Sequence, residues 1–527
     1  MANITIDGKP YSVPDGSLLI DAIDQAKTKL PRYCYHPGLS VAGNCRICQV
    51  EVEKMPRTVI ACNTRVTEGM VVHTASAKAK ESQQIVLEFL LANHPLDCPV
   101  CDQAGECKLQ DYYMEYGLYD PKFDDQKVKK AKKAVAVGPT IMLDQERCIL
   151  CSRCVRFTDE ITKTHEFGIF NRGDVSELDV YPGMELKNNY SGNVADICPV
   201  GALTDRDFRF KMRVWYLGSQ ESVCPGCSRG CNININYERS RPYKSDKGRV
   251  MRLKPRENAA VNRWWMCDEG RYAYKAIDQD RMTTIRTTAG ATTWEAAVRE
   301  VARLLKAAPA AKWGVIASAQ HTNEELYLVR KVFKDLLKWP HLGYHEAGED
   351  GPQDEILLRK DKNPNTAGAS VILDLGAANG AASVLERARK GELEGLVVFG
   401  RDLSKMGAPG LLQEVRSKVR TIVYIGSAQH ATAAAADVAL PEACYAEKDG
   451  TFTNFEGRVQ RIRMAVPPAG DARPGWKILS EIAAEIGEPL VFSKAEEVFK
   501  RLAAEQPAFA GMDYKVIGSQ GAVWSRR

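Results

Sequence analysis

The C-terminal half of this 527-residue chain almost lacks cysteine, since only one of its 16 cysteines, Cys444, lies beyond residue 267. The N-terminus has no basic start followed by an apolar run, so we expect no secretory signal and a reducing compartment. A run of about 18 apolar residues is also missing, which predicts no transmembrane helix and leaves any membrane contact to a partner. Fifteen cysteines crowded into one half of such a chain favour metal ligands over disulfides.

Two further absences narrow the function. The net charge of +5 is small for this length and does not predict nucleic-acid binding. No strand-like run leads into G-x-G-x-x-G or G-x-x-x-x-G-K-[ST], so the glycines after strands, as in FGRDLS, indicate turns and not a nucleotide site. The length predicts several domains, and a hydrophobic fraction of 44% is ordinary for a soluble protein.

The first set of candidate ligands is Cys34, Cys45, Cys48 and Cys62, spaced C-x10-C-x2-C-x13-C. A hairpin-like start (ITI, DGKP, YSV) and a helix capped by Ser17 precede it, and the strand-like runs CQVEVE, RTVIAC and MVVHT follow. Hairpin, helix, cysteine loop and returning strands resemble the β-grasp fold of plant-type [2Fe–2S] ferredoxins, although their first gap is C-x4-C. Zinc is the alternative for this set.

The second set, in HPLDCPVCDQAGEC, has three cysteines, Cys98, Cys101 and Cys107, but no fourth before Cys148. A helix from about residue 76 to 93, with Ile85, Val86, Phe89 and Leu90 as its apolar face, should end next to His94. Imidazole can replace thiolate on iron. Because His94 completes the one incomplete quartet, we expect a [4Fe–4S] cluster with three thiolates and one imidazole.

Two further sets follow along the chain. Cys148, Cys151 and Cys154 form the tight C-x2-C-x2-C run that wraps a [4Fe–4S] cluster, and Cys198, followed by Pro199, closes the set. The fourth set comprises Cys224, Cys227, Cys231 and Cys267, between which lie the strand-like runs CNININY and GRVMRLK. It resembles the small iron–sulfur domain of molybdopterin oxidoreductases, and a zinc ribbon is its alternative.

The second half alternates helical and strand-like segments, which predicts a parallel α/β sheet covered on both faces. Expected strands are 313–319, 371–375, 396–400 and 421–426, and expected helices are 294–305, 323–337, 384–391 and 409–418. Capping boxes are predicted at Thr322/Glu325 and Ser493/Glu496. The segment 440–461 reads as a loop and resembles one in molybdopterin oxidoreductases. Between residues 268 and 443 there is no cysteine to bind molybdenum, so we expect a cofactor-free scaffold in which Cys444 is a small buried hydrophobe.

The four sets in this order, together with LPE…EK-GT…N-EGRVQ, resemble the large iron–sulfur subunit of bacterial respiratory NADH:quinone oxidoreductase, complex I. The resemblance implies one [2Fe–2S] cluster on the first set, one [4Fe–4S] cluster on each of the others, and no molybdopterin. It implies a ferredoxin-like domain (1–75), a helical cluster domain (76–120), two further cluster domains (138–215 and 216–275) and an α/β scaffold (276–527). No side chain would be catalytic, because the chain would pass single electrons.

The resemblance also implies partners and a location. Electrons would come from the FMN/NADH-binding subunit and its [2Fe–2S] neighbour and leave to a ferredoxin-like two-cluster subunit. The chain would lie in the peripheral arm on the cytoplasmic side of the inner membrane. The rivals are a subunit of an NAD-linked formate dehydrogenase, a hydrogenase electron-transfer subunit and a zinc-bearing scaffold.

Two basic runs remain open. The run KVKKAKK (127–133) is either a solvated linker or a surface for an acidic neighbour. The run RDFRFKMRVW (206–215) either neutralises an anionic cluster, lines an interface or packs as half-buried structure.

Overall fold

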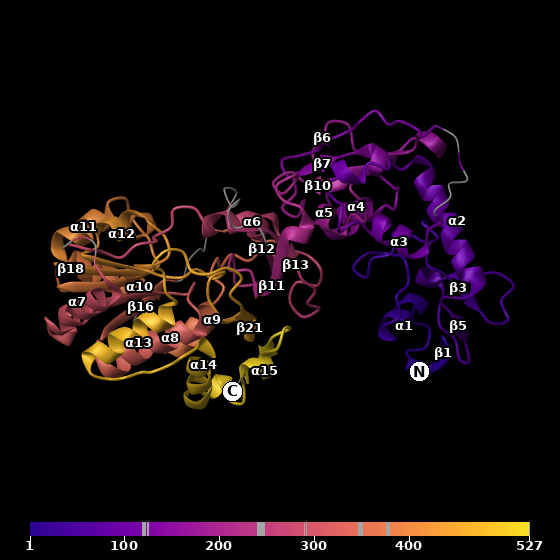
Figure 1. Cartoon of the computed structure of the whole chain (residues 1–527). Coiled ribbons are helices and arrows are strands. Elements are labelled where there is room, and N and C mark those ends of the chain that lie inside the picture. The colour runs from indigo at the N-terminus through magenta and orange to yellow at the C-terminus, as the bar shows by residue number, and fades with distance from the viewer. Residues whose placement is uncertain are drawn as a thin grey trace. The chain divides into compact units, whose positions relative to one another are not determined.

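The computed structural model describes residues 1–118, 123, 126–239, 248–288, 290, 292–345, 351–375 and 380–525. The chain divides into two compact units, Met1–Leu217 and Gly218–Arg527, and each is described by itself (Figure 1).

The first unit opens with a β-grasp. Its five strands have the order β2-β1-β5-β3-β4 and are β1 (Ala2–Ile6), β2 (Lys9–Val13), β3 (Gln49–Val52), β4 (Val59–Ile60) and β5 (Val71–His73). Strand β1 pairs antiparallel with β2 and parallel with β5. Helix α1 (Leu19–Gln25) buries four apolar side chains against this sheet. The predicted cap is wrong, because α1 begins after Leu18, which makes no side-chain cap, and Ser17 lies outside it.

Apart from the 17-residue helix α2 (Ala77–Asn93), the rest of the first unit is built from short elements. Its other helices are α3 (Lys108–Tyr116), α4 (Arg153–Arg156) and α5 (Asn193–Ile197). Strands β6 (Val135–Ala136), β7 (Ile141–Leu143) and β10 (Leu203–Asp205) form one small sheet, and β8 (Phe167–Phe170) and β9 (Glu177–Val180) form a hairpin. Short elements leave much of this unit as loops, and the candidate ligands lie mostly in those loops.

Helix α2 has the predicted ends but a different buried face. Ser76 caps it by accepting a hydrogen bond from the Ala79 N–H, and His94 follows its last residue. Its buried residues are Ala79, Gln83 and Leu87, whereas Phe89 is 66% exposed. Gln83 is buried because its side-chain amide donates to the Gln49 carbonyl of β3 at 2.9 Å, and this long-range contact sets the orientation of the helix.

The lysine run 127–133 is not a free linker. Lys127 donates to the carbonyls of Leu91 and Ala92 at the C-terminal end of α2, where a cation is favoured. Lys130 donates to two backbone carbonyls, while Lys132 and Lys133 pair with carboxylates of the same unit. These contacts fasten the run to its own unit, and carboxylates pair with two of its five lysines.

The second unit contains a doubly covered sheet. The six strands have the order β14-β19-β18-β17-β15-β16 and are β14 (Arg286–Thr287), β15 (Trp313–Ser318), β16 (His341–His345), β17 (Gly395–Phe399), β18 (Thr421–Gly426) and β19 (Val438–Pro441). All pairs are parallel except β14 with β19. The predicted parallel α/β sheet is confirmed.

Alternate side chains of these strands build two cores. On one face Val397, Phe399 and Ile425 meet α7 (Trp294–Lys306), α8 (Asn323–Val329), α9 (Thr366–Leu373), α13 (Gly475–Ile486) and α14 (Ala495–Glu505). On the other face Val398 and Tyr424 meet α10 (Ala381–Arg389), α11 (Leu411–Lys418) and α12 (Ala431–Ala435). Figure 1 shows α11 and α12 on one side of the strands and α7 and α13 on the other.

Smaller elements complete the second unit. One sheet contains β11 (Leu217–Val223), β12 (Asn232–Glu238) and β13 (Val250–Pro255), and another contains β20 (Gly450–Thr453), β21 (Arg458–Ile462) and β22 (Ala522–Val523). The remaining helices are α6 (Asp268–Tyr272) and α15 (Tyr514–Ile517).

Four predictions for this unit need correction. The apolar run 371–375 ends helix α9 and is not a strand, because five apolar residues do not distinguish a strand from a buried helix. The segment 440–461 is not a loop throughout, since it contributes to β19, β20 and β21. Helix α14 begins after Lys494, and Glu497, not Glu496, accepts the Ser493 N–H. Cys444 is only partly buried. The Thr322/Glu325 capping box is present as predicted, although the helix beyond it becomes π-helical over Arg330–Leu336.

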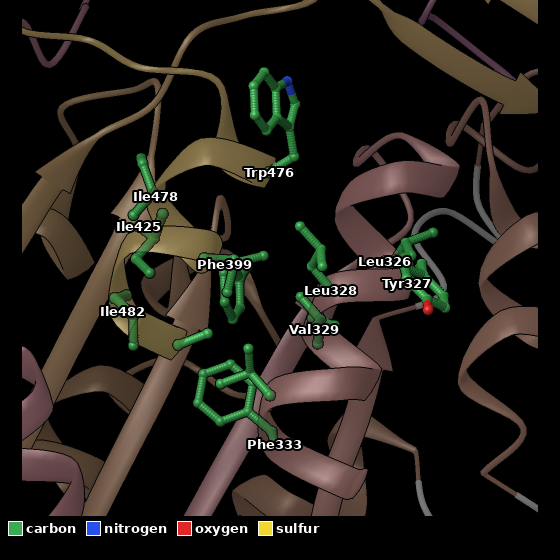
Figure 2. Packing of buried hydrophobic residues seen from close by; sticks show 14 of the residues in the cluster. Leu326, Tyr327, Leu328, Val329, Phe333, Phe399, Ile425, Trp476, Ile478 and Ile482 are labelled. Carbon is green, nitrogen blue, oxygen red and sulfur yellow. The ribbon is translucent and has the colours of Figure 1, made fainter. Parts of the chain in front are cut away.

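Phe399 offers a test of the larger core. Its side chain is 1% exposed, and its ring centroid lies 6.0 Å from that of Phe333 (Figure 2). Phe399→Ala should lower the free energy of unfolding by about 3–5 kcal/mol, because it leaves a cavity between sheet and helices. Chemical denaturation of the full chain measures this. Val491→Ala, at a side chain 81% exposed, should change it by less than about 0.5 kcal/mol, and equal effects would contradict the assigned core.

Candidate metal centres

The first ligand set forms a row of sulfurs at one end of the β-grasp. The thiols of Cys45 and Cys62 donate to the sulfur of Cys34, which lowers the pKa of Cys34 and raises the pKa of both donors. Cys62 also contacts Cys48, whose pKa is lowered. The four sulfurs therefore contact one another in the order Cys45, Cys34, Cys62, Cys48. They form an elongated row, with Cys45 and Cys34 in one half and Cys62 and Cys48 in the other.

The spacing of the sulfurs bears on the zinc alternative. A tetrahedral zinc ion, with Zn–S distances of about 2.3 Å, holds its sulfurs about 3.8 Å apart. In the part of the chain that the structure describes, one group of three or more ligand atoms lies within 4.8 Å of one another, and it contains His321, Glu325 and Glu442 but no cysteine. The cysteine sets are thus more open than a one-ion site, and an elongated row suits a two-iron cluster better than a single zinc ion.

The second set lies after α2, where the helix delivers His94. Burial and the nearby Arg147 lower the pKa of His94 to about 4, so its imidazole is neutral at pH 7. Its Nδ1 atom is buried without a hydrogen-bond partner. A neutral imidazole with an unused buried nitrogen fits a metal ligand. Arg147 lies close to Cys101 as well as to His94, and it pairs with Asp97 at 2.7 Å next to Cys98.

Two glycines shape this second loop. Gly105, with φ +88°, turns the chain between Cys101 and Cys107, and a Cβ there would lie 2.8 Å from Val214. Gly201 packs its backbone against the other side, where a Cβ would lie 2.5 Å from the Cys101 sulfur. The basic run 206–215 contributes Arg213, whose guanidinium donates to the carbonyl of Cys101 at 2.6 Å and to that of Pro99. This position favours the charge-neutralising interpretation of that run.

The third set is the most compact in sequence, and its backbone is unusual. Leu150 and Ser152 have φ of +51° and +59°, and a left-handed residue in each C-x2-C gap turns the chain around one centre. Cys198 arrives from the end of α5. Burial, followed by repulsion among the four sulfurs, raises the pKa of Cys154 well above its usual value. Such thiols ionise only when a metal or cation compensates them.

The fourth set lines a single cavity in the second unit with Cys224, Cys227, Cys231 and Cys267. Gly270 closes it, because a Cβ there would lie 2.9 Å from the Cys224 sulfur, and its N–H donates to the Cys267 sulfur at 3.3 Å. The loop is held from the α/β half, since the Phe455 N–H donates to the Ser228 carbonyl and Gln460 donates to that of Gly230.

All four sets share one local device. A backbone N–H two residues downstream donates to the cysteine sulfur and lowers the thiol pKa. The pairs are Cys45 with Ile47, Cys101 with Gln103, Cys107 with Leu109, Cys148 with Leu150, Cys151 with Arg153, Cys198 with Val200, and Cys224 with Gly226. Donors of this kind orient sulfur ligands and tune the potential of a cluster that they hold.

The first three sets converge on one core. The buried residues Tyr33, Leu87 and Val200 pack in a single cluster together with ligands of all three sets. The Lys108 N–H donates to the Pro199 carbonyl at 2.9 Å, which joins the residue after Cys107 to the residue after Cys198. These three sets are therefore parts of one packed body.

The second unit also contains a buried charged cluster with no cysteine. Lys448 donates to Glu325 at 2.7 Å and to Glu442 at 2.8 Å, and His321 Nε2 lies 2.9 Å from Glu442. Burial disfavours the charge on Lys448 and His321, but the carboxylates outweigh it and raise the pKa of both. The carboxylates thus have their cation in Lys448, and this cluster does not need a metal.

Comparison with protein families matches four iron–sulfur domains between residues 1 and 279 and a molybdopterin oxidoreductase domain after them. Matching models are the 2Fe-2S iron-sulfur cluster binding domain (1–77), the NADH-ubiquinone oxidoreductase-G iron-sulfur binding region (83–122), the ferredoxin-like domain of NADH-quinone oxidoreductase subunit 3 (138–204), the molybdopterin oxidoreductase Fe4S4 domain (219–279) and molybdopterin oxidoreductase (338–485).

Two relatives match almost the whole chain. The mitochondrial NADH-ubiquinone oxidoreductase 78 kDa subunit of Neurospora crassa is 31% identical over 97% of this chain and 84% of its own length. The G subunit of the Rickettsia felis NADH-quinone oxidoreductase is 30% identical over 100% of this chain and 93% of its own. The chain belongs to the family of NADH-quinone oxidoreductase G subunits and mitochondrial 78 kDa subunits. A crystal structure of an NAD+-reducing [NiFe]-hydrogenase matches with 28% sequence identity and a TM-score of 0.37. The match covers 40% of this chain and 91% of the hydrogenase chain. Among the residues that the structure describes, the helices of this family member are too short or too polar to cross a membrane.

Gly201 tests the second set. Gly201→Ala should push the Cys101 sulfur out of place, so the iron that the chain retains should fall by about four atoms, the content of one [4Fe–4S] cluster. Iron analysis of anaerobically purified protein measures it. Gly380→Ala, where a Cβ meets nothing within 4 Å, is the matched control. Unchanged iron in the Gly201 variant would show that this contact does not constrain the set.

Lys448 tests the buried charged cluster. Lys448→Met should cost about 3–5 kcal/mol in the free energy of unfolding, because it leaves Glu325 buried without its cation and Glu442 with His321 alone. The deficit should narrow as pH falls from about 8 to about 5, because protonation then removes the unpaired negative charge. Denaturation at each pH measures this. The exposed Lys477→Met should have almost no effect, and a deficit independent of pH would contradict the charge argument.

Proposed function

We propose that this chain is the iron–sulfur electron-relay subunit of an NADH:quinone oxidoreductase. The observation that carries the proposal is the joint packing of three ligand sets in one core, with backbone N–H groups directed at their sulfurs. Fifteen cysteines and one histidine complete four quartets, and membership of the NADH-quinone oxidoreductase family supports their use as cluster ligands.

The ligand sets suit one [2Fe–2S] and three [4Fe–4S] clusters. Cys34, Cys45, Cys48 and Cys62 would hold the first, His94, Cys98, Cys101 and Cys107 the second, Cys148, Cys151, Cys154 and Cys198 the third, and Cys224, Cys227, Cys231 and Cys267 the fourth. When bound, such clusters supply one-electron chemistry without protons or covalent intermediates. The chain supplies thiolates, N–H donors and surroundings in which most of these cysteines are buried.

The relay needs partners for the two ends of the reaction. We assign hydride chemistry to an FMN/NADH-binding subunit with its [2Fe–2S] neighbour, and onward transfer to a ferredoxin-like two-cluster subunit. The membrane is reached through these subunits, and the chain lies in the peripheral arm on the cytoplasmic side. Family membership supports this assignment, since the relatives are named as subunits of NADH-quinone oxidoreductase.

The α/β half acts as a scaffold without molybdopterin. Ligands of such sheets bind at the carboxyl ends of strands, where the strand order reverses, here between β15 and β17. Chain residues occupy this end: His321 follows β15 and bonds Glu442, and Arg401 follows β17 and bonds Asn363. The NAD-linked formate dehydrogenase alternative would need this space for molybdenum or tungsten.

Metal analysis tests the proposal. Anaerobically purified protein should contain about 14 iron atoms per chain, two for the [2Fe–2S] cluster and four for each [4Fe–4S] cluster, with no other metal in stoichiometric amount. Stoichiometric molybdenum or tungsten would replace the relay with the dehydrogenase alternative. About 10 iron atoms with one zinc ion would keep the relay but make one [4Fe–4S] site a structural zinc site.

A further inference from the structure

A short helix connects two of the ligand sets through its arginines. Helix α4 contains Cys154 of the third set and carries Arg153 and Arg156, three residues apart and hence on one face. Both reach the loop of the first set, which is more than 100 residues away in sequence. Glu160, just beyond the helix, accepts the Ser40 N–H of the same loop at 2.8 Å. The loop that carries Cys34 is thus fastened to the helix that carries Cys154.

Arg156 makes the most direct link. Its Nη2 donates to the Cys34 carbonyl at 2.6 Å and to the Cys151 carbonyl at 3.3 Å. Its Nη1 donates to the Ser40 carbonyl, and its Nε donates to Ser152 Oγ at 3.2 Å. One guanidinium therefore holds the backbone of a ligand from the first set and of a ligand from the third.

Arg153 supports the same junction without touching both ligands. Its Nη1 donates to the Ile197 carbonyl, next to Cys198, at 3.0 Å, and its Nη2 donates to the Tyr35 carbonyl, next to Cys34. Burial lowers the pKa of Arg153 against the opposing effect of the nearby sulfurs of Cys151 and Cys198. Two cations thus lie at the junction of sets that together contribute eight thiolates.

A guanidinium suits this place for two physical reasons. Its planar group offers five donors in a fixed fork, so it can hold several carbonyls at set positions, which a lysine ammonium on a flexible stem does less well. Its charge is permanent in proteins, and a fixed positive charge stabilises a cluster more when the cluster carries an additional electron. The potential of a cluster depends on such nearby charges and hydrogen bonds.

We propose that Arg156 is a positioning residue that fixes the [2Fe–2S] site of the first set against the [4Fe–4S] site of the third and raises the reduction potential of both. This inference rests on the proposed function, because it needs clusters on both sets. Electron tunnelling weakens steeply with separation, so a bridge of this kind controls how well the two centres exchange electrons.

The test uses the complete complex with Arg156→Lys, Arg156→Gln and, as a control, the exposed Arg172→Gln. Three quantities are measured: iron per chain, the midpoint potentials of the cluster signals in an electron paramagnetic resonance titration, and the spin-relaxation enhancement of the [2Fe–2S] signal by its neighbour. Arg156→Gln should shift the potentials of the first and third centres to more negative values and reduce the relaxation enhancement. The other two centres should not shift.

Arg156→Lys separates charge from geometry. It keeps the cation but loses the fork, so it should retain wild-type iron and most of the potential while the relaxation enhancement still falls. Wild-type potentials and relaxation in both Arg156 variants would overturn the inference. Loss of iron from all four sets in both variants would also overturn it, because that outcome indicates a requirement for folding only. An unsubstituted complex without a [2Fe–2S] signal would instead refute the proposed function.

Discussion

Negative charge on buried sulfur is the constraint on which the rest of the structure depends. Burial raises the pKa of thiols such as Cys148 and Cys198, so each ligand loop must supply partners that stabilise the thiolate. Within each loop, backbone N–H groups two residues downstream stabilise the thiolates by hydrogen bonding. This geometry requires tight turns, and in the third set the turns contain the left-handed residues Leu150 and Ser152. Arginines from more distant parts of the chain add positive charge near the sulfurs. Because their guanidinium groups donate to carbonyls of several loops, they also fasten the ligand sets together.

The α/β half meets the same constraint with different groups. Glu325 and Glu442 are buried carboxylates, and Lys448 supplies the compensating cation from the chain itself. The cysteine sets in the described structure have no side-chain cation bonded directly to their sulfurs, whereas this cluster has one bonded to both carboxylates. That contrast explains why cysteine spacing indicates a metal in the first half, while a denser group of ligand-type atoms in the second half does not.

What the sequence predicted depended on local spacing. The end of α2 at His94, the Thr322 capping box and the strands of the parallel sheet are encoded within short windows, and the structure confirms them. The four quartets stay a prediction, and the family matches support iron–sulfur domains over the same parts of the chain. Predictions that needed distant partners failed. The buried face of α2 is set by Gln83 bonding Gln49. The hydrogen bonds of Lys127 to the end of α2 also join residues about 35 positions apart, which the composition of the lysine run did not indicate. The roles of Arg153 and Arg156 were missed for the same reason, since no spacing rule relates them to residues 34–40.

The fourth ligand set is tied to the α/β half of the chain by hydrogen bonds to its loop. Its loop is held by Phe455 and Gln460, which belong to the hairpin strands and turn following Lys448. The same stretch of chain therefore contributes the cation of the buried charged cluster and the support of the fourth ligand loop. A substitution that displaces this stretch should therefore disturb both the buried charged cluster and the fourth ligand loop. The fourth ligand loop thus constrains the fold of the α/β half, whether or not that half binds a ligand. The contacts of Lys448 with the buried carboxylates, and of Phe455 and Gln460 with the fourth ligand loop, are enough to explain why this stretch keeps its fold. A cofactor bound to the α/β sheet is not needed for that explanation.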